Sequence, residues 1–93
     1  MVSYQLSLAA EADIDDILTF GIWQFGLDAA FDYHEALKSH FKEIANNPLH
    51  YMKVDHISAG SRRSVFRAHS IYFSFDKNRV FIERIIGRQN FST

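Results

Sequence analysis

The sequence predicts an α+β fold with the element order strand, helix, helix and then three strands. Two observations lead to it. Between Ser7 and Pro48, apolar residues recur every three or four positions, as they do along one side of a helix. At the start of the chain and over its final third, apolar and polar residues alternate, as they do in half-buried strands. Such a run of elements is expected to place a helical hairpin on one face of a mainly antiparallel sheet.

The chain opens with a predicted strand and helix. Residues 2–8 alternate between apolar side chains and serine or glutamine, which predicts a strand buried on one face. Ser7 is placed to cap the next helix, because its hydroxyl can accept a hydrogen bond from a free amide of the first turn. Glu11 and Asp13 lie near the positive end of the helix dipole. The apolar stripe of this helix consists of Ala10, Ile14, Ile17, Leu18, Gly21 and Phe25.

Phe20 and Trp23 lie off that stripe, on the side of the helix that should face water. Two explanations are open for these two large aromatic side chains. Either the long loop of the same domain covers them, or at least one of them anchors a partner protein.

The second helix is predicted to pair with the first. Gly26 ends the first helix, Asp28 is placed to cap the second, and the second ends at Asn46-Asn47-Pro48. Because so short a turn joins them, we expect the two helices to lie antiparallel, stripe against stripe. The stripe of the second helix consists of Ala30, Tyr33, Leu37, Phe41, Ile44 and Ala45.

Three further strands are predicted after a mixed connection over residues 49–61. Residues 62–69 alternate loosely, residues 71–75 alternate clearly, and residues 80–86 are rich in β-branched side chains. Residues 76–79 predict a tight turn, since Asp and Asn tolerate turn geometry. No repeat or linker interrupts the pattern, so we expect one domain over residues 1–93.

Composition favours a protein of the cytoplasm. Of the 93 residues, 47% are hydrophobic and 15% aromatic, which is enough for a packed core. The absence of cysteine excludes disulfides and thiolate metal sites, and nothing suggests secretion. The sequence has neither a signal-peptide pattern nor an apolar run long enough to cross a bilayer, so no membrane association is expected.

Charge is distributed unevenly. Residues 1–47 carry eight acidic and two basic side chains, a net charge of −6, whereas residues 48–93 carry eight basic and three acidic ones, a net charge of +5. This asymmetry indicates a basic face for an acidic partner or nucleic acid, or simply two solvated surfaces that differ. Arg62, Arg63, Arg67 and Arg84 fall on or beside predicted strands, which would align them as a patch for carboxylate or phosphate groups. Arg84 should face the open side of the sheet or pair with a carboxylate, because an arginine is costly to bury.

No motif for catalysis or for a cofactor is present. The four glycines are far apart, so none forms a phosphate-binding loop, and there is no cysteine or Gly-x-Ser-x-Gly nucleophile. His50, Asp55, His56 and His69 have no spacing typical of metal ligands. We therefore predict no catalytic residue, no metal and no cofactor.

Three parts of the chain carry a family resemblance. The opening part contains Tyr4-Gln5-Leu6-Ser7, Ala12 and Asp13. The helical part, which is the most specific, contains Phe25-Gly26, Ala30, Tyr33, Leu37, Phe41, Ile44-Ala45 and Asn47-Pro48. The strand part contains Gly60, Arg62, His69, Ile71, Tyr72, Phe73, Arg84-Ile85-Ile86 and Gly87-Arg88-Gln89-Asn90. Over nearly its whole length the sequence resembles toxins of the ParE branch of the RelE/ParE toxin–antitoxin superfamily. Many members carry a His after the aliphatic pair and then an Asp; here the His is absent and Asn90 takes the Asp position.

The resemblance implies a toxin that binds DNA gyrase, traps its DNA-cleavage state and is neutralised in a hetero-oligomer by a ParD-type antitoxin. We expect no sequence-specific contact with nucleic acid. The residues predicted to bind partners are Phe20, Trp23, Arg62, Arg67, Arg84 and Arg88. An amphipathic antitoxin helix is expected in a groove along the hairpin, followed by an extended acidic segment that crosses toward the arginines.

The alternative on the same fold is a RelE-type endonuclease that cuts mRNA on the ribosome. That chemistry requires basic residues and a proton-transfer group, typically a Tyr or His near the C-terminus. After Arg84 this chain has neither, and Phe91 cannot transfer a proton. A third alternative is a binding module without toxic activity, because a fold does not guarantee a function.

Overall fold

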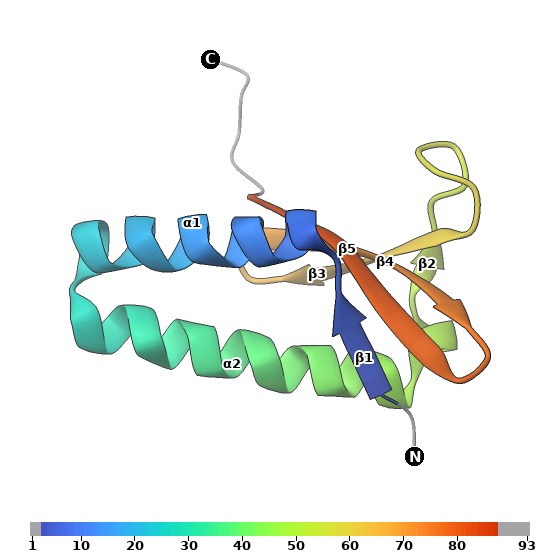
Figure 1. Cartoon of the computed structure of the whole chain (residues 1–93), viewed down its shortest axis with the longest axis horizontal. Coiled ribbons are helices and arrows are strands. Elements are labelled where there is room, and N and C mark those ends of the chain that lie inside the picture. Colours follow the sequence, from blue (N-terminus) through green and yellow to red (C-terminus); the bar gives the residue numbers. More distant parts are fainter. Residues whose placement is uncertain (1–2, 88–93) are drawn as a thin grey trace.

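The computed structural model describes residues 3–87 and has the predicted α+β architecture (Figure 1). Strand β1 (Ser3–Leu6) leads into helix α1 (Leu8–Phe25), which is joined at Gly26 to helix α2 (Leu27–Asn46). A short 3₁₀ helix, η1 (Pro48–His50), follows. The remaining elements are the strands β2 (Met52–Lys53), β3 (Ser61–Phe66), β4 (His69–Asp76) and β5 (Arg79–Gly87). Neither helix is both long and apolar enough to span a bilayer.

The five strands form one mixed sheet in the order β1-β5-β4-β3-β2. Only β1 and β5 run parallel; the other neighbours are antiparallel. The sequence prediction missed β2, so four strands and not three follow the hairpin. Met52–Lys53 spans two residues, too few for an alternating pattern to show.

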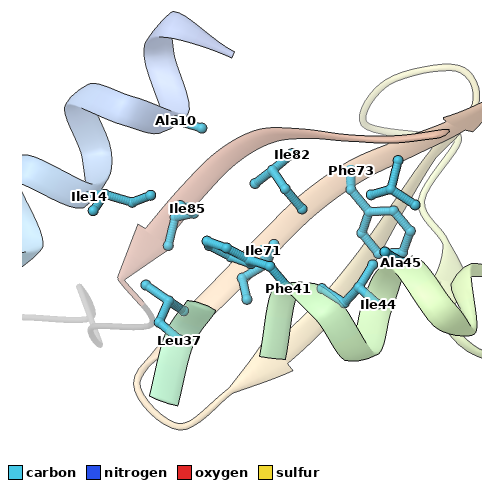
Figure 2. Packing of buried hydrophobic residues seen from close by; sticks show 11 residues of the cluster. Ala10, Ile14, Leu37, Phe41, Ile44, Ala45, Ile71, Phe73, Ile82 and Ile85 are labelled. Atoms are coloured by element: carbon cyan, nitrogen blue, oxygen red, sulfur yellow. The ribbon is translucent and has the colours of Figure 1, made fainter. Parts of the chain in front are cut away.

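The core lies between the hairpin and one face of the sheet. Figure 2 shows the ring of Phe41, from α2, among the isoleucines of β4 and β5. Phe41 and Phe73 are fully buried, and the ring of Tyr4 packs 5.4 Å from that of Phe41. Replacing so buried a phenylalanine by alanine typically costs about 3–5 kcal/mol. The buried cluster contains Ala10, Ile14, Leu37, Phe41, Ile44, Ala45, Ile71, Phe73, Val80, Ile82 and Ile85.

A bulge in β5 decides which side chains of that strand enter the core. Tyr72 of β4 pairs with Arg84, but the next residue, Phe73, pairs with Ile82, so Glu83 is the extra residue. The bulge turns Ile82 and Ile85 to the core while Arg84 points to the other face, as expected for a side chain that is costly to bury.

The start of α1 is tied to β5. The Ser7 hydroxyl accepts a hydrogen bond from the Ala10 amide at 2.9 Å, which confirms Ser7 as the N-cap. The same hydroxyl donates to the Glu83 carbonyl at 2.8 Å, and the Ser7 amide donates to the Ile82 carbonyl at 3.0 Å. Ser7 thus fixes the strand β5 and the helix α1 to each other where β1 ends.

Asp13, six positions after Ser7, continues this attachment of α1 to β5. Its carboxylate accepts hydrogen bonds from Nε and Nη2 of Arg84, at 2.8 and 3.0 Å, and from the Ile85 amide at 2.8 Å. Strand β1 pairs with β5 only as far as Ile82, so it offers no carbonyl to the Ile85 amide. The Asp13 carboxylate accepts that hydrogen bond instead. Arg84 therefore pairs with a carboxylate, as predicted.

Three details of the sequence prediction are wrong. Asp28 does not cap α2; the N-cap is Gly26, with φ of 95° and no side-chain hydrogen bond to the helix. Phe25 of the predicted stripe is 70% exposed, because it lies at the end of α1, where the hairpin extends beyond the sheet (Figure 1). The strand predicted over residues 62–69 ends at Phe66, because Arg67 adopts φ of 53° and begins the turn to β4.

The tight turn predicted over residues 76–79, between β4 and β5, is confirmed, and both Lys77 and Asn78 have positive φ there.

We predict that Asp13→Ala lowers the free energy of unfolding by about 1–3 kcal/mol, because it leaves the Ile85 amide without an acceptor. Burial by itself raises the pKa of Asp13, but the hydrogen bonds from Arg84 and Ile85 and the Arg84 charge outweigh it, so the pKa is lowered. Because the pKa of Asp13 is lower in the folded protein than in the unfolded protein, the ionised carboxylate stabilises the fold at pH values above the unfolded pKa. This contribution is lost as the pH falls through the folded pKa.

The measurement is urea unfolding of the wild type and of Asp13→Ala between pH 7 and pH 2. The stability gap between them should be widest near neutral pH and shrink below about pH 4. Asp16→Asn, an exposed change on the same helix, is the control and should leave stability nearly unchanged. A gap that stays constant over this pH range would contradict the role given to Asp13.

Candidate functional site

A largely apolar groove lies between the outer half of the hairpin and the turn from β3 to β4. It encloses about 510 Å³, a volume typical of sites that bind other molecules. Its floor is the close contact of the two helices, where a Cβ on Gly21 would lie 3.3 Å from that of Ala30. The lining residues are Ile17, Phe20, Gly21, Phe25, Ala29, Ala30, Tyr33, Ala68, His69 and Gly87.

One wall of the groove is polar. The hydroxyl of Tyr33 lies 2.6 Å from Nδ1 of His69 and 3.5 Å from the Phe66 carbonyl oxygen, which it donates to. The guanidinium of Arg67 lies over the rings of Phe66 and Tyr33, 5.0 and 5.6 Å from their centroids. These contacts place one positive charge and two titratable groups at the end of an apolar groove.

The titratable groups of this wall are held neutral. Burial lowers the pKa of His69, which favours the uncharged imidazole near neutral pH. Burial raises the pKa of Tyr33, and the positive charge of Arg67 offsets part of that rise. A partner's apolar side chain can therefore enter the groove without displacing a charged histidine.

Phe20 and Trp23 are both exposed, at 54% and 81%, so the connection after α2 does not cover them. They belong to different surfaces, because Phe20 lines the groove and Trp23 is not among the residues that do. Both side chains are exposed, as predicted, but Phe20 lines the groove together with Ile17 and Gly21 of the stripe and therefore does not lie opposite the stripe.

The predicted arginines do not form one patch. Arg62 pairs across the sheet with Phe73, on the core face, and donates to the Tyr51 carbonyl oxygen at 2.7 Å. Arg84 lies on the opposite face and is held by Asp13, while Arg67 lies in the turn beside the groove. The basic row that does form is Arg63 and Arg84 on either side of Tyr72. Arg88 lies outside the described residues.

Sequence reasoning missed several groove residues. Tyr33 and Phe25 were assigned to packing stripes, and His69 was considered as a metal ligand and as part of the family resemblance but not as a binding residue. One available signal was the end of α1, where Phe20, Trp23 and Phe25 are too widely spread around the helix for all of them to be buried on one face.

A Ser–His–Glu arrangement also occurs, away from the groove. Nε2 of His40 lies 2.6 Å from the Ser64 Oγ, and Nδ1 lies 3.2 Å from an oxygen of Glu43. Ser64 is only 2% exposed and faces the hairpin, so a substrate cannot reach its hydroxyl. These bonds satisfy a buried serine and fasten α2 to β3. Within residues 3–87 no group of His, Cys, Asp or Glu is arranged to hold a metal ion.

Comparisons with known proteins agree with this description. The family model described as the ParE toxin of the type II toxin-antitoxin system, parDE, matches residues 4–90. Toxin ParE1 of Caulobacter vibrioides (strain ATCC 19089 / CIP 103742 / CB 15) is 33% identical over 86 residues, which cover 92% of this chain and 88% of the relative. A solved structure described as the chromosomal ParDE TA system from P. aeruginosa has a TM-score of 0.82 at 19% identity, covering 96% of this chain and 98% of that one.

At 19% identity, the similarity to the solved structure establishes only the fold. The match to the family model and the 33% identity to Toxin ParE1 establish that the sequences are homologous. The chain belongs to the ParE toxin family of type II toxin–antitoxin systems.

Proposed function

We propose that this toxin acts in the cytoplasm by binding DNA gyrase, without catalysis of its own, and is neutralised by a ParD-type antitoxin in a hetero-oligomer. The observation that carries the proposal is the 510 Å³ groove with an apolar lining beside exposed aromatic side chains. An apolar groove of this kind suits an amphipathic helix, and exposed aromatics are frequent anchors at protein interfaces. The site is built to bind protein.

The groove supports the docking of an antitoxin helix along the hairpin. Its rim includes Phe20 and Phe25 on α1, while Arg67 stands at the opposite wall. A segment that is disordered when free recovers its ordering cost through apolar burial, and charge pairs then set its register. Arg67 is the cation that stands beside the groove, where its charge can attract an acidic residue of that segment.

One observation favours the endonuclease alternative. Tyr33, His69 and Arg67 bring two proton-transfer groups and a cation together at the groove wall. Those residue types could serve RNA cleavage. Within residues 3–87 the lining of the groove includes no lysine or arginine that could meet a phosphate backbone, which favours the binding of protein.

We predict that the purified toxin lowers the supercoiling activity of gyrase and makes cleaved linear DNA accumulate. Translating ribosomes incubated with the toxin should keep their mRNA intact, because the proposed mode of action is binding. Plasmid supercoiling gels and primer extension on mRNA measure the two effects. Cleavage of mRNA at the ribosomal A site that disappears in His69→Ala would establish the endonuclease reading instead.

We predict that Phe20→Ser weakens antitoxin binding by roughly tenfold or more, since it removes an apolar anchor from the groove. The melting temperature should hardly change, because Phe20 is already 54% exposed. Calorimetric titration and thermal unfolding are the measurements. Leu8→Ser, at an 84% exposed position on the same helix, is the matched control. If Phe20→Ser unfolds the protein, Phe20 is a core residue and not an anchor.

We predict that Arg67→Glu slows association with the antitoxin and makes the rate less dependent on salt, because a steering charge is reversed. Stopped-flow rates at several salt concentrations measure this effect. Arg79→Glu makes the same charge change on β5, where the guanidinium packs over Phe81, and serves as the control. Equal effects of both substitutions would mean that net charge, and not Arg67, governs the rate.

A further inference from the structure

A second apolar surface lies at the end of the hairpin. We call it the tip patch: it consists of Ile22 and Trp23 in the last turns of α1 and Leu27 and Phe31 at the start of α2. Their exposed fractions are 36%, 81%, 55% and 46%, in that order. The hairpin extends beyond the sheet, so the turn that carries these residues stands at one end of the molecule (Figure 1). Large apolar side chains gathered on a surface mark a contact site.

The tip patch is separate from the groove. None of its four residues is among those that line the groove. Trp23 follows the buried Ile14 by nine positions, about two and a half helical turns, so the two side chains leave α1 on opposite sides. Leu27 and Phe31, four positions apart, share one face of α2. A helix seated in the groove would therefore leave Trp23 uncovered.

The charge around the tip patch differs from that at the groove wall. Residues 3–37 contain no lysine or arginine. The exposed Asp28 follows Leu27 directly, and the exposed Asp32 follows Phe31. The groove wall, in contrast, carries Arg67. An acidic partner is thus attracted to the groove and repelled from the tip, while a basic partner is attracted to the tip.

We propose that the tip patch is the surface by which this toxin contacts its target, through an apolar pocket ringed by lysine and arginine on the target protein. The antitoxin occupies the other surface. This assignment rests on the proposed function, in which the target is gyrase and the antitoxin is an acidic ParD-type protein. It assigns a different partner to each of the two aromatic residues predicted as anchors: Phe20 contacts the antitoxin, and Trp23 contacts the target.

Trp23 is the only tryptophan, so toxin containing 5-fluorotryptophan has a single reporter at the tip patch. Purified gyrase should shift or broaden its ¹⁹F resonance, and the ParD-type antitoxin should leave the resonance in place. The double variant Trp23→Ser, Leu27→Gln should bind gyrase roughly tenfold more weakly or worse and bind the antitoxin as the wild type does. The matched control is Leu8→Ser, Leu49→Gln, which changes two exposed side chains elsewhere and should alter neither affinity.

The double variant Asp28→Asn, Asp32→Asn tests the contribution of the acidic residues beside the tip patch. It should slow association with gyrase at low salt and leave antitoxin binding unchanged. If the wild type binds gyrase and the Trp23, Leu27 double variant binds it equally well, the tip patch is not the target surface, while the proposed function stands. A resonance moved by the antitoxin would assign the tip patch to the antitoxin and overturn the inference. A wild-type toxin that fails to bind gyrase overturns the proposed function, and this assignment with it.

Discussion

The attachment of α1 to β5 is the constraint on which the rest of the structure depends. Strand β1 pairs with β5 only as far as Ile82, so the remaining half of β5 has a free edge. Ser7 and Asp13 occupy that edge with hydrogen bonds to the Glu83 carbonyl and the Ile85 amide. Because unpaired backbone groups are costly when removed from water, these bonds fix where α1 begins and how it lies on the sheet.

The two binding surfaces follow from that attachment. With its first turns fixed over the edge of β5, α1 runs for 18 residues and carries the hairpin beyond the sheet (Figure 1). The outer half of the hairpin then meets the turn between β3 and β4 through Tyr33, and a groove remains beside that contact. Apolar residues that a longer sheet would have buried, such as Phe25 and Leu27, remain exposed. The surfaces available for binding are those that the core leaves uncovered.

Hydrogen bonds between polar side chains fasten elements of the fold to one another, both within the sheet and between the sheet and α2. The Ser61 hydroxyl donates to the bulged Glu83 at 2.8 Å, and His40 binds Ser64 between α2 and β3. Each bond satisfies a group that is buried or nearly so, and no side-chain polar atom buried in residues 3–87 lacks a partner. An arrangement that resembles a hydrolase triad therefore has a structural explanation here.

Much of the fold followed from local sequence patterns. The stripes of the two helices, the Ser7 cap and the turn at residues 77–78 were predicted, because each depends on neighbours within about four positions. The two-residue β2 and the bulge at Glu83 were not predicted, because a strand of two residues has no period and a bulge shows only when the partner strand is known. Asp28 has the residue type of a cap, but the helix begins at Leu27, two positions earlier than a cap at Asp28 requires.

By itself the sequence determined the fold class, the pairing of the helices and the family resemblance. Only the tertiary structure decided which arginines and aromatics are available to a partner. Asp13 and Arg84 are 71 positions apart, so no local pattern shows that one neutralises the other. Phe20 and Trp23 look alike in a helical pattern, yet one lines the groove and the other lies outside it. The physical reason is that helical periodicity gives the direction of a side chain from its own axis, whereas the layer packed against that side is set by contacts between distant segments.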